Sequence, residues 1–146
     1  MEVKVKKLYS DAKLPTRGSD KAAAYDVYAY IEKGEVEIKP HTTAKISTGL
    51  SMTPPNGYFV GVYARSGLST KEGLRPGNCV GICDEDYTGA YLVALHNDFD
   101  TPKIVKHGDR IAQIILQQRF DMDFKEVDEL EETNRGAGGF GSTGKQ

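Results

Sequence analysis

Short runs in which apolar and polar residues alternate occur along most of the chain. In residues 25–31, for example, every second residue is apolar, which places these side chains on one face of a strand. Clusters of Gly, Pro, Asn and Asp separate such runs, and no helical segment of about 10–15 residues lies between them. This spacing predicts an all-β fold: a sandwich, a jelly roll or a barrel. The other strand-like runs are 3–5, 44–48, 58–64, 80–83, 90–96 and 110–117.

One short stretch favours a helix. Residues 68–74 predict one or two helical turns, with Ser66 as the N-cap. The length of 146 residues fits one domain. We therefore expect a single all-β domain over residues 1–146, a jelly-roll-like β-barrel or sandwich with one short helix. Residues 134–146 are expected to form a flexible C-terminal arm.

The composition narrows the class of protein. Hydrophobic residues make up 38% of the chain, and 19 basic against 21 acidic residues give a net charge of −2. This balance argues against a strongly basic surface for nucleic acid or membrane, and no apolar run approaches the ~20 residues of a membrane-spanning helix. Cys79 and Cys83 would lie ~13 Å apart along a strand, too far for a disulfide. Reduced cysteines and the lack of a signal-peptide pattern favour a soluble intracellular protein, cytoplasmic, or nuclear if the source is eukaryotic or viral.

Glycine is concentrated towards the C-terminus. Five of the 16 glycines fall within residues 136–144. Residues 136–141 fit the dinucleotide pattern G-x-G-x-x-G, and residues 139–145 fit the first seven positions of a phosphate-binding P-loop. Both patterns require a following helix, and the sequence ends at Gln146, so we expect neither site.

Two interpretations of this glycine-rich segment remain open. Its Gly and Ser content is typical of a flexible terminus. Phe140, with Arg135, Ser142 and Thr143 around it, instead favours an arm that folds over a nucleotide. Arginine and hydroxyl groups suit a polyphosphate, and an aromatic ring covers a planar base. The acidic run 121–132 before it is expected to be a solvated strand edge and a linker.

Two polar patterns in the body of the chain each have two interpretations. Arg65, Ser66 and Gly67 precede the predicted helix and form either an anion site or a helix cap with a surface arginine. Gln113 interrupts an otherwise apolar strand, on the face that carries Ile111 and Ile115. It marks either a sheet edge or a contact with a ligand.

Residues 77–91 are expected to form a β-hairpin. Asp84 closes its first strand directly after apolar residues, and it is either an ordinary turn acid or a general base for water. Glycines at positions 77, 81 and 89 allow a planar group to lie against the hairpin backbone. Tyr87 is placed to pack on a sugar.

Five segments, in a fixed order, cover nearly the whole chain. They are AAAYDVYA (22–29), RSGLS (65–69), GNCVGICDEDYTG (77–89), GDRIAQIIL (108–116) and RGAGGFGSTG (135–144). Together they resemble the five sequence blocks of the homotrimeric dUTPase family (deoxyuridine 5′-triphosphate nucleotidohydrolases). The departures from the family's usual residues are mild. Ala24 replaces a usual Gly, Cys83 stands where an apolar residue such as Ile is common, and position 88, here Thr88, often holds Arg or Gln.

The resemblance implies that the protein hydrolyses dUTP to dUMP and pyrophosphate, which limits uracil incorporation into DNA and supplies dUMP for dTMP synthesis. It makes Asp84 the base that activates a water for attack on the α-phosphate, and Asp26 the carboxylate that holds Mg²⁺ through water. It also implies a homotrimer with active sites shared between subunits, in which the C-terminal arm reaches a neighbour. The implied substrate-binding residues are Arg65, Ser66, Gly67, Asn78, Val80, Gly81, Tyr87, Gln113, Arg135, Phe140, Gly141, Ser142 and Thr143.

The resemblance also divides these residues by the part of the nucleotide that they would contact. Asn78 and the backbone around residues 80–81 would read the edge of uracil, with Tyr87 against deoxyribose. The residues at 65–67 and Gln113 would hold the phosphate chain. In the arm, Phe140 would lie over uracil, and the γ-phosphate would be clamped by Arg135, Ser142 and Thr143.

Two other functions stand beside this one. A dCTP deaminase, or a bifunctional deaminase–diphosphatase, uses a similar scaffold, but cytosine recognition and deamination need different contacts in the hairpin and an added acid–base group. The complete block at 135–144 favours plain dUTP hydrolysis. The second alternative is a nucleotide-gated regulatory protein, and the absence of an extra partner-binding insertion in the sequence counts against it.

Overall fold

The computed structural model describes residues 1–32, 34–78 and 80–139. Within these residues it has twelve strands and one short helix, and every pair of strands that is hydrogen-bonded is antiparallel. The elements are β1 (Lys4–Lys7), β2 (Thr16–Arg17), β3 (Tyr25–Tyr28), β4 (Glu35–Ile38), β5 (Thr43–Ser47), β6 (Leu50–Thr53), β7 (Tyr58–Tyr63), α1 (Ser66–Glu72), β8 (Leu74–Pro76), β9 (Gly81–Cys83), β10 (Leu92–Asn97), β11 (Lys103–Lys106) and β12 (Arg110–Gln118).

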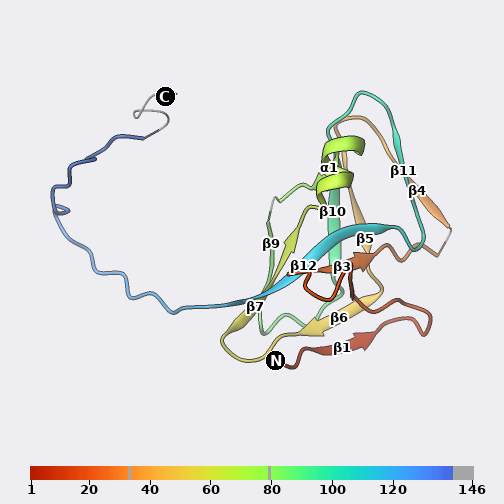
Figure 1. Ribbon diagram of the computed structural model, residues 1–146, viewed down its shortest axis with the longest axis horizontal. Helices are drawn as coiled ribbons and strands as arrows, with labels where there is room; N and C mark the ends of the chain where they lie inside the picture. Colours follow the sequence, from red (N-terminus) through yellow and green to blue (C-terminus); the bar gives the residue numbers. More distant parts are fainter. Residues whose placement is uncertain (33, 79, 140–146) are drawn as a thin grey trace.

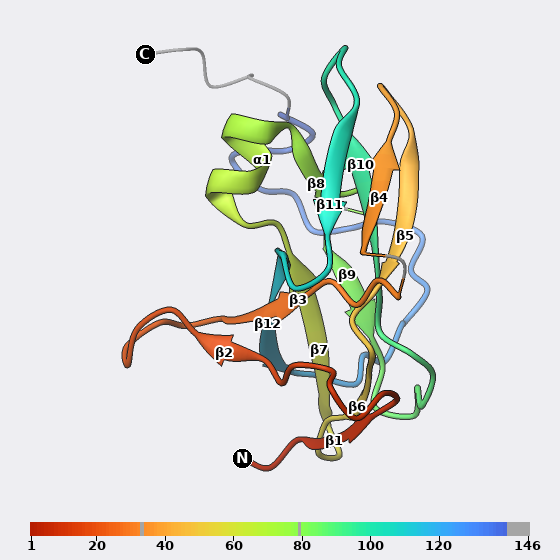
Figure 2. The same ribbon diagram turned by 90° about the vertical axis from the view of Figure 1, so that its right-hand side faces the viewer.

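The strands form two main sheets and two ribbons. The larger sheet has the order β2-β3-β12-β7-β9, and the smaller one has the order β5-β10-β8 (Figures 1 and 2). The ribbons are β1-β6 and β11-β4. The predicted all-β class with one short helix is confirmed. Each sheet has open edges, so the described strands do not close into one hydrogen-bonded barrel.

One hydrophobic core lies between the sheets and gives the fold its stability. It takes side chains from both main sheets and from the ribbons, including Val27 of β3, Leu95 of β10, Val105 of β11 and Ile111 of β12, all of which are buried. Strand β10 alternates buried and less buried positions along its length, as expected for a strand with one face on a core. Burial of this apolar surface is the main term that favours the folded state.

The helix begins earlier than predicted and is capped differently. Arg65 occupies the N-cap position with an extended backbone and makes no side-chain capping bond, so the prediction that Ser66 is the N-cap is wrong. Ser66 is already helical, and its carbonyl oxygen accepts hydrogen bonds from the hydroxyls of Ser69 and Thr70. The helix ends before Gly73, whose φ of 68° suits glycine, and a Cβ there would lie 2.4 Å from the ring of Phe99.

The segment 77–91 does not pair with itself. Its first half contains β9, which pairs with β7 at the edge of the larger sheet, while the chain after residue 91 joins β5 and β8 through β10. The predicted hairpin is therefore wrong for the described residues. Neighbouring runs in a sequence suggest a hairpin, but here both runs find distant partners because β9 and β10 belong to different sheets.

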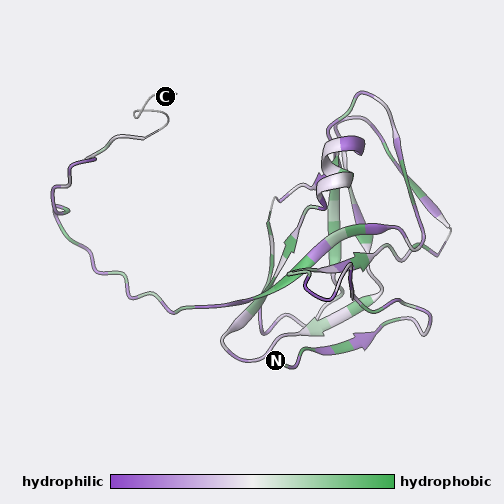
Figure 3. Ribbon diagram, viewed as in Figure 1, coloured by the Kyte–Doolittle hydropathy of each residue, from purple (hydrophilic) through white to green (hydrophobic). Residues whose placement is uncertain are grey.

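The chain leaves the body of the molecule after β12. Residues 119–139 form neither helix nor strand and extend away from the sheets (Figure 1). Apolar and polar residues alternate at the start of this segment, over residues 119–124 (Figure 3), and Phe120, Met122 and Phe124 are exposed. The expected solvated linker is thus present, but the expected strand edge is not. Within the described residues, no helix has the length and apolar character that a membrane crossing requires.

Candidate active site

A first hollow, of about 440 Å³, gathers most of the predicted phosphate-binding and metal-binding residues. We name it the cationic pocket. It lies where β3, β12 and the start of α1 meet, so three separate sequence blocks contribute to it. Its lining residues are Gly18, Ala22, Ala23, Ala24, Asp26, Arg65, Ser66, Gly67, Arg110, Gln113 and Ile115.

Asp26 is the only carboxylate among the residues that line the cationic pocket, and two arginines hold it. Its Oδ1 accepts a hydrogen bond of 2.8 Å from Nε of Arg65, and its Oδ2 accepts one of 3.2 Å from Arg110. The Asp26 side chain is 12% exposed. Two cations against one anion leave the pocket with an excess of positive charge, which suits a polyphosphate.

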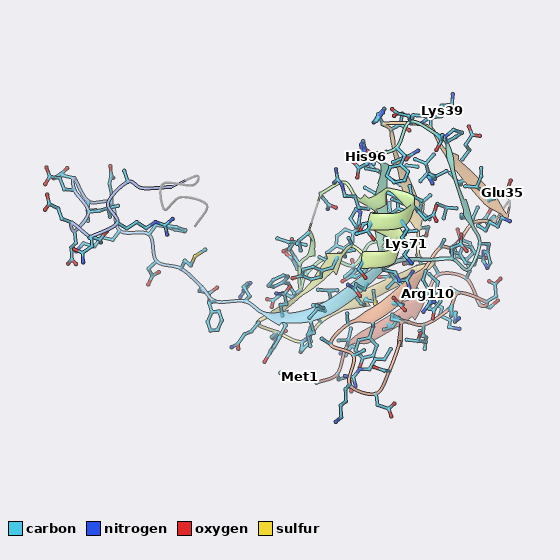
Figure 4. All side chains as sticks on the ribbon, turned by 45° about the horizontal axis from the view of Figure 1, so that its top comes forward. Met1, Glu35, Lys39, Lys71, His96 and Arg110 are labelled. Carbon is cyan, nitrogen blue, oxygen red and sulfur yellow. The ribbon has the colours of Figure 1, made fainter. Side chains whose placement is uncertain are left out.

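Arg110 is a residue that the sequence reasoning missed. It is the first residue of β12 and is labelled in Figure 4. Its backbone oxygen also accepts a hydrogen bond of 3.1 Å from Arg65. The signal was present in the sequence, because the block GDRIAQIIL places a basic residue three positions before Gln113 on a strand that pairs with the one carrying Asp26.

Gln113 is not at a sheet edge. Strand β12 lies between β3 and β7, so the edge interpretation is wrong and the polar side chain faces the cationic pocket. Its amide nitrogen donates to the carbonyl oxygen of Ala64 at 2.9 Å. This bond fixes the turn between β7 and α1, and it therefore positions Arg65 beside Asp26.

The start of α1 completes this pocket. Ser66 and Gly67 lie in the first helical turn, where backbone N–H groups have no partner within a helix. A Cβ on Gly67 would meet no atom within 4 Å, so the backbone there is open to an approaching group. Arg65, Ser66 and Gly67 thus present a guanidinium, a hydroxyl and bare backbone to the same space.

A second hollow, of about 230 Å³, lies over β9 and gathers most of the residues predicted to contact the nucleoside. We name it the β9 pocket. Val80 is exposed and does not line it. Its lining residues are Val62, Asn78, Gly81, Ile82, Cys83, Asp84, Tyr87, Ala90, Tyr91 and Leu92.

Gly81 brings the floor of the β9 pocket close to a neighbouring strand. A Cβ at this position would lie 3.1 Å from Cβ of Val62 and 3.1 Å from the amide nitrogen of Asn78. Such a contact is tighter than normal packing allows, so a larger residue would displace one of these groups. Glycine here therefore keeps the Asn78 amide against the backbone of β9.

Asp84 is exposed at the end of β9. Of the two acidic residues that follow it, Glu85 is partly buried and Asp86 is exposed. Glu85 accepts a hydrogen bond of 2.6 Å from the backbone N–H of Gly57 and forms an ion pair of 3.6 Å with Arg119. Its carboxylate thus ties the loop after β9 to the turn before β7. Among these acids, Asp84 is the one that lines the β9 pocket.

Aromatic side chains form one wall of the β9 pocket. Tyr87 is 43% exposed and donates a hydrogen bond of 3.0 Å to the carbonyl oxygen of Ala90. Tyr91 lies beneath it and is buried. Burial raises the pKa of the Tyr91 hydroxyl, and burial also raises the pKa of the Cys83 thiol. Both groups therefore stay neutral near pH 7.

The two pockets are far apart within one chain. Asp26 is level with Gln113 and Tyr63 in the larger sheet, whereas Asp84 comes one residue after Cys83, which is opposite Val60. Across the sheet, strands β3 and β9 are three strand spacings apart, about 14 Å. Along the strand direction, the positions of Asp26 and Asp84 differ by four residues of β7, about 13 Å. Together these offsets separate the two carboxylates by about 20 Å.

Of the predicted arm residues, the structure describes Arg135, which lines neither pocket. Arg135 belongs to the segment that extends from the body, and its Nε donates to the carbonyl oxygen of Gly138 at 2.8 Å. Phe140, Gly141, Ser142 and Thr143 lie outside the described residues. Among the described residues, the structure therefore brings most of the predicted residues of the body together in two groups, and Arg135 lies outside both.

The cationic pocket fits a magnesium ion only in a limited way. In the described part of the chain, no group of three or more His, Cys, Asp or Glu is placed to hold a metal. Asp26 offers one carboxylate, and both of its oxygens already accept from arginines. Mg²⁺ keeps several waters and binds through one or two carboxylates together with substrate phosphates, so a water-mediated contact is compatible with this donor set.

A model of the dUTPase family matches residues 10–144 of the chain. A deoxyuridine 5′-triphosphate nucleotidohydrolase of Kluyveromyces lactis is 44% identical over 144 residues, which are 98% of this chain and 94% of the relative. One of Desulfitobacterium hafniense is 46% identical over 133 residues, 90% of this chain and 87% of the relative.

Solved structures agree with this relationship. A mutant dUTPase of Staphylococcus bacteriophage 80alpha with dUpNHpp superposes with a TM-score of 0.82 at 27% identity, over 98% of both chains. A mutant dUTPase of phage phi11, described with a structural Mg(II) ion, has a TM-score of 0.78 at 22% identity over 90% of this chain and 100% of its own, which shows the same fold. From the family match, the identity to these relatives and the shared fold, we conclude that the chain belongs to the dUTPase family.

Proposed function

We propose that this protein hydrolyses dUTP to dUMP and pyrophosphate, and so limits uracil incorporation into DNA and supplies dUMP for dTMP synthesis. The proposal is supported by one observation: the predicted site residues outside the C-terminal arm fall mostly into two pockets of different chemistry. The β9 pocket has an exposed carboxylate, Asp84, at its wall, while the cationic pocket holds two arginines. A nucleoside triphosphate has a neutral and an anionic end that match these two pockets.

Recognition of the base is assigned to the β9 pocket. Asn78 and the backbone around residues 80–81 present donors and acceptors to a planar base that lies against Gly81. Cytosine would reverse one of these hydrogen bonds and leave a buried polar group unpaired, which costs about 1–3 kcal/mol. The Tyr87 ring would pack against deoxyribose and leave no space for a ribose 2′-hydroxyl.

The phosphate chain is assigned to the cationic pocket. Arg65 and Arg110 supply positive charge, Ser66 and Gly67 supply a hydroxyl and backbone N–H groups, and Gln113 holds the turn that carries Arg65. Asp26 would hold Mg²⁺ through water. A bound Mg²⁺ would neutralise phosphate charge and orient the phosphates for in-line attack.

The hydrolytic step is assigned to Asp84. Its carboxylate would accept a proton from a water as that water attacks the α-phosphorus, the bond from the α-phosphorus to the bridging oxygen would break, and pyrophosphate would leave. Positioned proton transfer of this kind contributes about 10²–10⁴-fold in rate. Asp84 is exposed at the end of β9, so a water can reach its carboxylate.

The separation of the pockets supports a site shared between subunits. Asp84 of the β9 pocket and Asp26 of the cationic pocket are about 20 Å apart in one chain. One dUTP therefore cannot place its α-phosphorus beside Asp84 and its phosphate chain in the cationic pocket of the same chain. In a symmetric trimer the β9 pocket of one subunit would face the cationic pocket of the next. The arm of a subunit would then supply Arg135, Phe140, Gly141, Ser142 and Thr143.

The proposed activity is tested by measuring pyrophosphate release from dUTP, dTTP, dCTP and UTP with Mg²⁺, together with ammonia release from dCTP. We expect rapid release from dUTP alone. The variant Asp84→Asn should bind dUMP normally and lose at least about 10²-fold in turnover. The matched control Asp86→Asn, which changes an exposed neighbouring acid, should keep wild-type turnover. Ammonia release from dCTP, or full turnover in Asp84→Asn, would contradict the proposal.

A further inference from the structure

In the wall of the β9 pocket, Tyr87 is held in place by three contacts. Its hydroxyl donates to the carbonyl oxygen of Ala90 at 3.0 Å, and its backbone N–H donates to the carbonyl oxygen of Asp84 at 3.2 Å. Its ring faces that of Tyr91, with centroids 6.1 Å apart and the ring planes tilted by 34°. The ring of this half-exposed tyrosine therefore depends on a buried aromatic neighbour for its orientation.

Gly89 fixes the other side of the Tyr87 ring. A Cβ at this position would lie 2.5 Å from the hydroxyl oxygen of Tyr87 and 2.6 Å from the ring carbon that carries it. Gly89 does not have a left-handed backbone, so an alanine there would cause no backbone strain, but its Cβ would displace the Tyr87 ring. The Tyr87 ring can therefore occupy its observed position only because Gly89 has no side chain.

Tyr91 is a rigid support because its backbone is hydrogen-bonded to β6 and to Thr48, the residue that follows β5. Its N–H donates to the carbonyl oxygen of Leu50 at 2.8 Å. Its carbonyl oxygen accepts from both the backbone N–H and the hydroxyl of Thr48, at 3.0 Å and 2.9 Å. Tyr91 is 3% exposed, so its ring cannot turn away into solvent.

The hydroxyl of Tyr91 plays no part in this support. It is buried and has no hydrogen-bond partner among the described residues. The Cys83 thiol is close enough for each group to affect the pKa of the other, but a thiol is a weak hydrogen-bond partner. Only the ring of Tyr91 is thus available to act on Tyr87.

We propose that Tyr91 is a positioning residue that, together with Gly89, holds the Tyr87 ring against the sugar and so sets the discrimination between deoxyribonucleotides and ribonucleotides. The proposal rests on the proposed function and deepens it. Tyr91 does not touch the nucleotide in this account. It acts on the sugar through Tyr87, and loss of the ring contact lets Tyr87 move and admits a 2′-hydroxyl.

The test measures two ratios: kcat/KM for dUTP over UTP, and the binding constant for dUMP over UMP by calorimetry. In Tyr91→Leu and in Gly89→Ala we expect both ratios to fall about 3- to 10-fold, the worth of one aromatic contact, mainly through tighter UTP and UMP binding. The matched control Tyr91→Phe keeps the ring and loses only an unpaired hydroxyl, so both ratios should stay at the wild-type value.

A double-mutant cycle separates positioning from general damage to the fold. In a Tyr87→Leu background the ratios are already low, and adding Tyr91→Leu or Gly89→Ala should change them no further. Additive losses, or unchanged ratios in both single variants, would overturn the inference. Absence of dUTP turnover in the wild type would instead reject the proposed function. The inference would then be decided by the dUMP-to-UMP binding ratio alone. If the wild type showed no preference for dUMP over UMP, the inference would be rejected as well.

Discussion

At the scale of single residues, charge decides what each pocket can bind. Asp26 and Asp84 are both aspartates, yet Asp26 is enclosed by two arginines and Asp84 is exposed at the end of a strand. The first is a fixed counter-charge that holds Arg65 and Arg110 in place. The second makes no side-chain hydrogen bond or ion pair within residues 1–32, 34–78 and 80–139, which suits the proposed proton transfer from water.

Arg110 offers a test of the charge in the cationic pocket. Arg110→Gln removes one of the two cations on Asp26, so we expect kcat/KM for dUTP to fall about 10- to 100-fold, the worth of one charge-assisted hydrogen bond. Steady-state kinetics at two salt concentrations would measure this loss. The control Lys71→Gln removes an exposed lysine of α1 that lines neither pocket, and it should change kcat/KM by less than about 2-fold. Equal losses in both variants would mean that only the net charge matters.

The sequence was informative for residues whose neighbours lie in the same block. Arg65, Ser66 and Gly67 were expected together because they are consecutive, and the structure does place them in one pocket with Asp26. Arg110 was missed because its contact with Asp26 depends on the register of β12 against β3. Pairing register is a long-range property, and one residue of shift would turn the side chain to the other face. The roles of these residues stay predictions.

At the scale of elements, buried polar side chains hold together strands that the hydrophobic pattern leaves undefined. Asn97, at the end of β10, is fully buried, and its amide nitrogen donates to the carbonyl oxygens of Ile38 and Thr101. Its amide oxygen accepts from the backbone N–H of Phe99. One side chain thereby joins β10 to β4 and to the loop before β11. Nothing in the local sequence distinguishes this asparagine from a turn residue.

Thr48 provides a measurable case of the same kind. Its hydroxyl donates to the carbonyl oxygen of Tyr91 and accepts a bond of 3.3 Å from the N–H of Leu50, all in buried surroundings. Thr48→Val keeps the shape but removes the hydroxyl, so we expect a loss of about 1–3 kcal/mol in the free energy of unfolding. Urea denaturation would measure it. The control Thr42→Val removes an exposed bond to Lys39 and should cost less than about 0.5 kcal/mol, and equal costs would contradict the account.

The elements themselves were only partly predictable. Alternating apolar residues located β3, β5, β7, β10 and β12 within a few positions, because each has one face on the core. The same pattern could not tell which strands pair. The run at 77–91 therefore looked like a hairpin, although β9 belongs with β7 and β10 with β5 and β8.

At the scale of the whole molecule, one chain does not bring the proposed catalytic and phosphate-binding residues close enough together to act on one nucleotide. The two carboxylates assigned to water activation and to the metal are about 20 Å apart on the larger sheet. The segment after β12 extends from the body with exposed Phe120, Met122 and Phe124, as a segment that packs on a neighbouring subunit would (Figure 1). The proposed hydrolysis of dUTP in a trimer would explain both features.

The most direct test of the shared site is complementation between two inactive variants. Asp84→Asn and Arg65→Gln chains, each with a different tag, are co-expressed, and oligomers that carry both tags are purified and assayed for pyrophosphate release from dUTP. In each mixed trimer one of the three sites receives an intact Asp84 from one chain and an intact Arg65 from another, so about one third of wild-type turnover should return. If Asp84 and Arg65 act within the same chain, the mixed oligomers will be as inactive as the two variants alone, and the account will be wrong.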